Sequence, residues 1–157
     1  MLARTHLAFA LFLVLIFFHS VENFYLFAFV FLLSSLLPDI DTPFSKIGKI
    51  KIFRLLNFFT KHRGIFHSFI FVISISILLI FFENSIWLAF LLGYSSHLIL
   101  DSLTIQGVRL FYPFKIKIKG LVKTNGFFEN FLFVFLVIIN FFLIIKFFLI
   151  SNKWIYI

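Results

Sequence analysis

Histidine and aspartate are scarce in this sequence, and nearly all of them stand at the ends of long apolar runs. The residues that share this placement are His6, Asp39, Asp41, His62, His67, His97 and Asp101. Imidazole and carboxylate ligands, in a chain without cysteine, suit zinc, manganese or iron. These candidates exceed the four ligands of one tetrahedral zinc, so we expect one or two ions, with an aspartate as the bridge between two.

Local spacing favours convergence of four of these side chains. His97 and Asp101 are four positions apart in an apolar run, so they lie on one face of a helix. Asp39 and Asp41 follow Pro38, and we expect this segment to be extended. Alternate side chains point the same way along an extended backbone, so both carboxylates would face one side.

Three further candidates depend on a turn or on a helix start. His62 and His67 would diverge on a continuous helix, but a turn at Gly64 would bring them together. Glu129 opens the last apolar run and is a candidate ligand, general base or orienting partner. An acidic residue is also favoured there by the helix dipole alone. Asp39, Asp41 and Glu129 are the candidate catalytic residues, because an uncoordinated carboxylate can accept a proton.

Each motif also has a purely structural interpretation. A single histidine at a membrane interface usually only makes hydrogen bonds, and Asp-x-Asp after a helix is often a turn or a cap. A His-x-x-x-Asp pair can be one structural hydrogen bond. Ionisable groups at membrane depth are costly unless they are paired or functional. Their gathering at one end of four helices therefore favours a metal site over isolated structural roles.

The composition indicates a membrane protein. Of the 157 residues, 62% are hydrophobic and 13% charged, whereas a soluble domain is about half apolar and about a quarter charged. We therefore predict an all-α, polytopic membrane bundle in which residues 1–157 form a single integral-membrane domain. The lipid bilayer is the expected partner. The net charge of +8 is interpreted as loop charge that sets topology, and no nucleic acid is expected.

Apolar runs separated by polar breaks predict five transmembrane helices, at about 2–18, 21–37, 65–82, 85–100 and 127–150. Arg4 and the first apolar run resemble a signal peptide. No small-residue cleavage pattern follows them, so this run is predicted to be a retained helix.

The charge of the connecting segments alternates. All but two of the 14 basic residues belong to the N-terminus or to the segments before the third and fifth helices, and the exceptions are Lys146 and Lys153. The positive-inside rule places those segments and the N-terminus in the cytoplasm. The predicted location is the plasma membrane, as a multi-pass protein with the seven candidate ligands on the cytoplasmic side and His19 on the outer side.

The motifs occur in an order that resembles a known family. They are Thr5-His6, Pro38-Asp39-Ile40-Asp41, the segment from His62 to Ser68, the segment from Gly93 to Asp101, the segment from Thr104 to Val108, and the segment from Phe111 to Phe114. This series resembles the YdjM-type, LexA-regulated family of membrane-bound metal-dependent hydrolases, from residue 5 to about residue 114, with a weaker match around Glu129.

That family is distantly similar to zinc-dependent phospholipase C, whose ligand order is His, Asp, His and then His-x-x-x-Asp. The resemblance implies His6, Asp39 or Asp41, His62 or His67, and His97 with Asp101 as the ligands. The relatives hold a further zinc through a later His-x-x-x-Glu, and no histidine follows His97 here. The resemblance therefore implies at most two metal ions.

Three functions compete for this site. The first is a hydrolase that attacks a phosphoester, such as a phospholipid, through metal-activated water at the cytoplasmic membrane face. The second is a non-catalytic membrane scaffold with a structural metal or a polar network. The third is a metal-ion transporter, which would need polar residues across the membrane. The outer halves of the predicted helices are apolar except for Ser74, Ser76 and Asn140, which disfavours transport.

Overall fold

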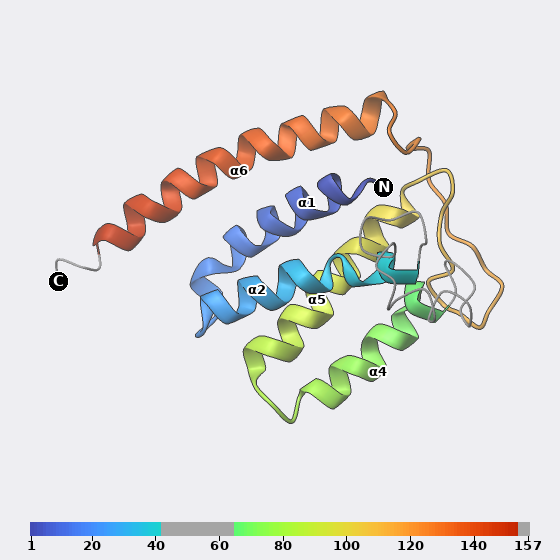
Figure 1. The fold of residues 1–157 in the computed structure, drawn as a ribbon, viewed down its shortest axis with the longest axis horizontal. Coiled ribbons are helices and arrows are strands. Elements are labelled where there is room, and N and C mark those ends of the chain that lie inside the picture. Colours follow the sequence, from blue (N-terminus) through green and yellow to red (C-terminus); the bar gives the residue numbers. More distant parts are fainter. Residues whose placement is uncertain (42–64, 154–157) are drawn as a thin grey trace.

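The computed structural model describes residues 1–41 and 65–153, and this part of the chain is all-helical (Figure 1). The α-helices are α1 (Ala3–Ile16), α2 (Phe24–Ser34), α4 (Phe69–Leu79), α5 (Asn84–Ser102) and α6 (Phe127–Lys153). Short 3-10 helices accompany them: η1 (Phe17–Ser20), η2 (Leu37–Asp41) and η4 (Ile65–His67). The predicted all-α class is confirmed.

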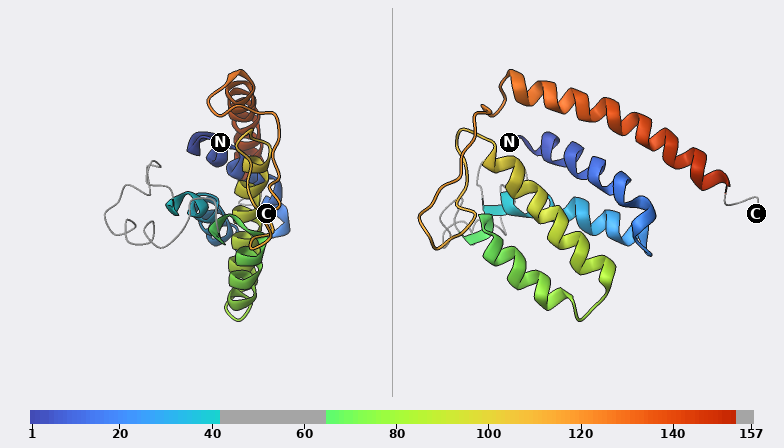
Figure 2. Two further views of the ribbon diagram at one scale, coloured as in Figure 1. Left: turned by 90° about the vertical axis from the view of Figure 1, so that its right-hand side faces the viewer. Right: turned by 180° about the vertical axis from the view of Figure 1, so that it is seen from behind.

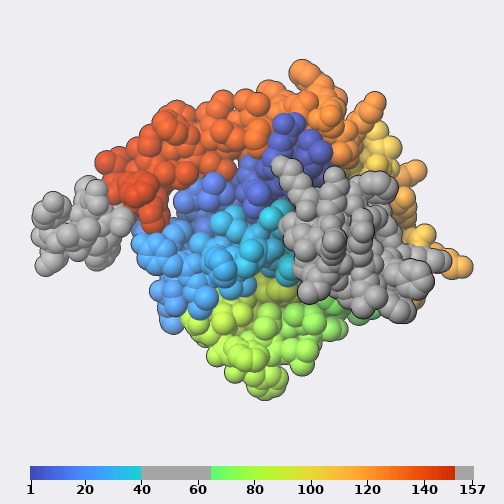
Figure 3. Space-filling model, viewed as in Figure 1, coloured from blue at the N-terminus to red at the C-terminus, as the bar shows by residue number. Residues whose placement is uncertain are grey.

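The helix α5 is central to the bundle. It packs against α2, α4 and α1, while α6 packs along α1. Figures 1 and 2 show α6, α1, α5 and α4 following one another across the molecule, with α2 beside α5. In the space-filling view α6 covers α1 along one edge of the molecule (Figure 3). The starts of α1 and α6 and the end of α5 meet at the same end of the bundle.

The second and third predicted helices are shorter than expected because polar side chains cap their starts. The Asn23 Oδ1 atom accepts a hydrogen bond from the Leu26 amide at 3.3 Å, so α2 begins at Phe24. The Ser68 Oγ atom does the same for the Phe71 amide at 3.3 Å. Such caps satisfy free amides in the first turn of a helix. His67 is thereby excluded from α4 and lies in η4.

The expected extended segment at Asp39 is wrong. The segment from Leu37 to Asp41 is the 3-10 helix η2, in which the Asp39 amide donates to the Leu36 carbonyl at 3.2 Å. Pro38 fits there because its fixed φ angle suits the first turn of a helix. Asp39 therefore reaches its position through a tight turn and not through strand-like alternation.

Two helical segments are long and apolar enough to cross a membrane, 3–20 and 127–150. Within the described residues, α2 and α4 are apolar but shorter, and α5 does not meet the same test. Large apolar side chains are exposed along α6, among them Phe131, Phe135, Phe141 and Phe142. Exposed apolar surface of this kind suits a lipid environment.

The α2 and α5 helices approach closely at Gly93. A Cβ atom placed there would lie 2.2 Å from Ser34 Oγ and 2.5 Å from the Phe31 carbonyl oxygen. Phe31 is fully buried in this contact and belongs to a core cluster with Ala89. The close approach matters for the site, because it places the end of α2 directly beside the next turn of α5.

Candidate metal centre

Five of the predicted ligands converge at one end of the bundle. Their ligand atoms form two groups, in each of which the atoms lie within 4.8 Å of one another. The first group is His6, His97 and Asp101, and the second is Asp39, His67 and His97. They come from α1, η2, η4 and α5, so the four predicted apolar runs meet here as the sequence indicates.

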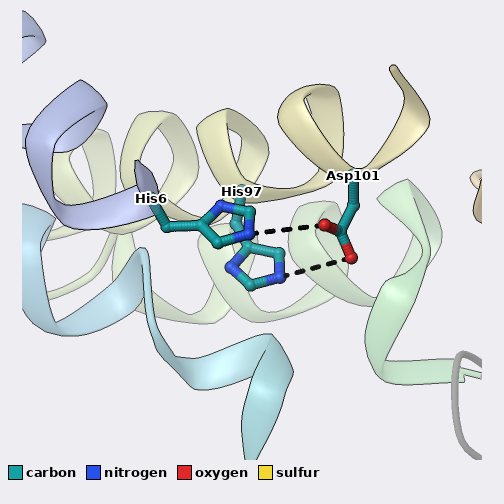
Figure 4. A group of neighbouring side chains, drawn as sticks. All are labelled: His6, His97 and Asp101. Atoms are coloured by element: carbon teal, nitrogen blue, oxygen red, sulfur yellow. Dashed lines mark ion pairs between the residues drawn. The ribbon is translucent and has the colours of Figure 1, made fainter. Parts of the chain in front are cut away.

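Asp101 faces three imidazole rings. Its Oδ1 atom lies 3.3 Å from His6 Nε2, and its Oδ2 atom lies 3.8 Å from His97 Nε2 and 3.9 Å from His67 Nε2. Figure 4 shows how the two oxygens point to different rings, Oδ1 to His6 and Oδ2 to His97. Oδ1 also contacts the α-amino group of Met1. The carboxylate is almost fully buried, so it requires positive partners.

The two nitrogens of His97 have different roles. Nδ1 lies 2.7 Å from the Ser35 carbonyl oxygen, which can only accept, so Nδ1 carries a hydrogen and, in the neutral imidazole, Nε2 carries the lone pair. Nε2 is buried and has no hydrogen-bond partner among the described residues. It faces carboxylate oxygens of Asp39 and Asp101, each at 3.8 Å.

A lone pair held against two carboxylates is electrostatically unfavourable unless a metal ion lies among them or Nε2 itself is protonated. A histidine that donates one ring hydrogen to a carbonyl and presents the other nitrogen is the usual arrangement at protein metal sites. The donor set of imidazole and carboxylate matches zinc or another first-row divalent ion. The residues present therefore fit a metal ion.

The remaining ligands surround His97. The His6 ring stacks on it, with ring centroids 3.8 Å apart and the planes within 7° of parallel. The His67 ring meets it edge-on at 5.7 Å. The Nδ1 atom of His6 is buried and has no hydrogen-bond partner within residues 1–41 and 65–153. The rings of His6 and His67 thus both pack directly against the ring of His97.

Asp39 is the most exposed of the five. Its side chain is 20% exposed, whereas those of His97 and Asp101 are 0% and 3% exposed. Burial raises the pKa of the Asp39 carboxyl group, and the nearby His6 opposes this shift. A divalent cation beside it would favour the charged carboxylate in the same way as His6. Asp39 is therefore the carboxylate of the two groups that lies closest to solvent.

Glu129 lies in neither ligand group, although it is fully buried. Its Oε1 atom accepts hydrogen bonds from the Leu2 amide at 2.5 Å and the Thr5 hydroxyl at 3.0 Å. Its Oε2 atom accepts from the Asn125 amide at 2.5 Å. The carboxylate thus ties the start of α6 to the first turn of α1, which carries His6.

Two predicted ligands lie outside this description. His62 falls between the described ranges, and the same holds for the side chain of Asp41. Conversely, sequence reasoning missed Ser35, whose carbonyl orients His97. A backbone carbonyl has no signature in the sequence, and only the close contact of α2 with α5 reveals it.

Comparisons with known proteins place the chain in a family. The model of the YdjM inner membrane protein family matches residues 1–155. A similar protein is the uncharacterized protein YvsG of Bacillus subtilis (strain 168), 33% identical over 107 residues. That alignment covers 61% of this chain, which spans only 64% of the relative's length. No solved structure matches. The predicted resemblance is confirmed: the chain belongs to the YdjM inner membrane protein family.

Proposed function

We propose that this chain is a multi-pass plasma-membrane hydrolase that uses a divalent metal ion, with zinc as the best fit, to cleave a phosphoester at the cytoplasmic membrane face. The observation that carries the proposal is the Nε2 atom of His97. The Nδ1 hydrogen of this ring is bound by the Ser35 carbonyl, and its buried Nε2 atom faces carboxylate oxygens of Asp39 and Asp101 at 3.8 Å with no hydrogen-bond partner of its own among the described residues.

The protein's own part in this chemistry is to hold the ion and to move a proton. His6, His67, His97 and Asp101 are buried and supply the fixed ligands. When bound, a divalent ion lowers the pKa of water toward about 7 and polarises the phosphoester. Asp101 Oδ1 lies beside His6 and its Oδ2 atom lies beside His97, so this carboxylate would help to hold the ion.

Asp39 is the best-placed proton acceptor among the described carboxylates. It touches the ligand cluster through His97 and its side chain is the most exposed of the set. Glu129 already accepts three hydrogen bonds, so we assign it to positioning α1. Asp41 remains a second candidate for the proton acceptor on the basis of sequence alone.

The phosphoester substrate rests on family likeness and on charge. The resemblance to zinc-dependent phospholipase C suggests a phosphodiester, including that of a lipid. Exposed Lys115, Lys117 and Lys119 lie in the α5–α6 connection, at the end of the bundle that carries the ligand cluster (Figure 1). Positive charge beside the site would attract an anionic substrate. The distribution of basic residues supports the cytoplasmic side.

The first test is metal content. Protein purified in detergent would be analysed for bound elements beside a His97→Ala, Asp101→Ala double variant, with His19→Ala as the matched control. His19 is exposed and belongs to η1, outside both ligand groups. We expect about one or two equivalents of zinc or manganese in the wild type and the control. The double variant should lose them while circular dichroism shows that its helices persist.

The second test separates a hydrolase from a scaffold. Metal-loaded protein would be screened against phosphodiester and phosphomonoester substrates, including phospholipids, beside Asp39→Asn. Turnover that falls about 100-fold or more in Asp39→Asn, with metal retained, supports the assigned proton acceptor. Bound metal without turnover on any phosphoester would favour the scaffold, and no metal after reloading would overturn the proposal.

A further inference from the structure

The connection between α5 and α6 exposes apolar side chains next to basic ones. Lysine alternates with apolar residues from Phe114 to Lys119, and Leu121 and Lys123 follow. We call this set the basic-apolar surface: Phe114, Lys115, Ile116, Lys117, Ile118, Lys119, Leu121 and Lys123. No aspartate or glutamate occurs between Asp101 and Glu129, and both of those are buried, so the positive charge is uncompensated within the connection.

The apolar side chains of this surface are exposed, although neighbouring apolar side chains in the connection are buried. Phe114 is 64% exposed, Ile116 66% and Leu121 92%, whereas Val108 and Leu110 in the same connection are buried. A connection that merely joined two helices would keep such side chains covered or would be polar. The pattern therefore calls for an apolar partner.

The connection is held in place by backbone hydrogen bonds. Val108 and Ile118 exchange amide–carbonyl bonds of 2.9 Å in both directions, and the Ile105 amide donates to the Val122 carbonyl at 3.0 Å. The Phe69 amide at the start of α4 donates to the Leu110 carbonyl at 2.8 Å. These bonds fix the connection to the bundle, while the side chains of the basic-apolar surface stay exposed.

We propose that the basic-apolar surface docks into the headgroup layer of the surrounding bilayer and recognises anionic lipid. Phe114, Ile116 and Leu121 would enter the boundary between headgroups and acyl chains, while the lysines contact lipid phosphates. The exposed apolar surface continues into Phe127 and Phe128 at the start of α6. The bilayer that α6 enters is therefore the apolar phase nearest to the connection.

Both anionic lipid and nucleic acid would attract the lysines, but the apolar side chains favour lipid. A single-stranded nucleic acid is bound by lysines together with aromatic rings on which bases stack. Here the alternating apolar partners are chiefly isoleucine and leucine, which offer no ring for stacking. They do suit acyl chains. This proposal goes beyond hydrolysis and does not depend on a bound metal.

The test measures the depth of the connection in bilayers of defined charge. The chain has no cysteine, so a single Leu121→Cys variant of the full-length protein can carry an environment-sensitive fluorophore. It would be placed in nanodiscs of phosphatidylcholine alone or with increasing phosphatidylglycerol, with lipids brominated in the acyl chains as quenchers. Phe81→Cys, exposed at the opposite end of the bundle, is the matched control.

We expect quenching at position 121 to rise with the fraction of phosphatidylglycerol and to fall in high salt. The control at position 81 should be quenched equally in all compositions. Changing Lys115, Lys117 and Lys119 to Gln should raise severalfold the phosphatidylglycerol fraction needed for half-maximal quenching, with unchanged helicity.

Three results would overturn the proposal. The first is an unquenched probe at position 121 in every lipid. The second is quenching that is independent of lipid charge and of the lysine substitutions, which would leave only an apolar contact. The third is a probe that responds to a short RNA but not to phosphatidylglycerol, which would assign the surface to nucleic acid.

Discussion

The Glu129 carboxylate lies outside the ligand cluster, but it anchors the helical turn that carries the candidate ligand His6. It receives the Leu2 amide and the Thr5 hydroxyl on one oxygen and the Asn125 amide on the other. His6 follows Thr5 directly and lies 3.3 Å from Asp101. Loss of this anchor would loosen the first turn of α1 and, with it, one ligand of the candidate metal centre.

The Glu129→Gln substitution tests this anchor. An amide keeps one acceptor oxygen but turns an NH₂ group toward a backbone N–H, so at least one buried donor loses its partner. We expect the free energy of unfolding in detergent to fall by about 1–3 kcal/mol, measured by thermal or denaturant unfolding. Glu22→Gln, on an exposed glutamate, is the control and should change stability by less than about 0.5 kcal/mol. Equal stability of both variants would contradict the anchoring role.

Part of the site was predictable residue by residue. Histidine and aspartate at the same ends of the apolar runs indicate convergence, and the structure gathers His6, Asp39, His67, His97 and Asp101. The orientation of each ring was not predictable. It depends on partners such as the Ser35 carbonyl, which every residue type would offer equally.

At the scale of helices, the contact between α2 and α5 determines where His97 can lie. Gly93 allows the backbones to approach, and one turn later His97 Nδ1 reaches the Ser35 carbonyl. Any side chain at position 93 would push the two helices apart. The bond that fixes the nitrogen roles of His97 would then lengthen.

The Gly93→Ala substitution should therefore be destabilising, although alanine favours a helix more than glycine does. Its Cβ would meet Ser34 Oγ at 2.2 Å and the Phe31 carbonyl oxygen at 2.5 Å. We expect a loss of about 1–3 kcal/mol from overpacking, measured by thermal unfolding, together with reduced metal content. Ile99→Val, on the exposed side of the same helix, should have little effect on either quantity. A Gly93→Ala protein as stable as the wild type would show that the helices separate at no cost.

The existence of the five helices followed from apolar runs, but their limits did not. The predicted spans 21–37 and 65–82 became α2 and α4, which are each 11 residues long. Asn23 and Ser68 begin these helices late because their side chains bond to amides three residues on. The same residue types occur elsewhere without capping, so composition alone could not locate the starts.

For the molecule as a whole, the predicted topology can be tested by chemical labelling. The distribution of basic residues predicts that the α5–α6 connection is cytoplasmic and that the turn between α4 and α5 is external. These two regions lie at opposite ends of the bundle (Figure 1). The connection contains the exposed Gln106, and the exposed Asn84 is the first residue of α5, directly after the turn.

Single-cysteine variants of the cysteine-free chain would report the topology directly. A membrane-impermeant maleimide should label Asn84→Cys in intact cells and Gln106→Cys only after permeabilisation. The opposite pattern would invert the orientation. Labelling of both positions from one side would show that α5 does not cross the membrane.

The ligand cluster draws on segments that are far apart in the order of synthesis. His6 is synthesised early, whereas His97 and Asp101 are synthesised only with α5. His97 belongs to both ligand groups. A nascent chain that has not yet produced α5 therefore holds neither ligand group complete. Metal uptake would then follow the synthesis of α5. A bound ion would mark chains that have passed this point, and chains stalled before α5 would be distinguishable by its absence.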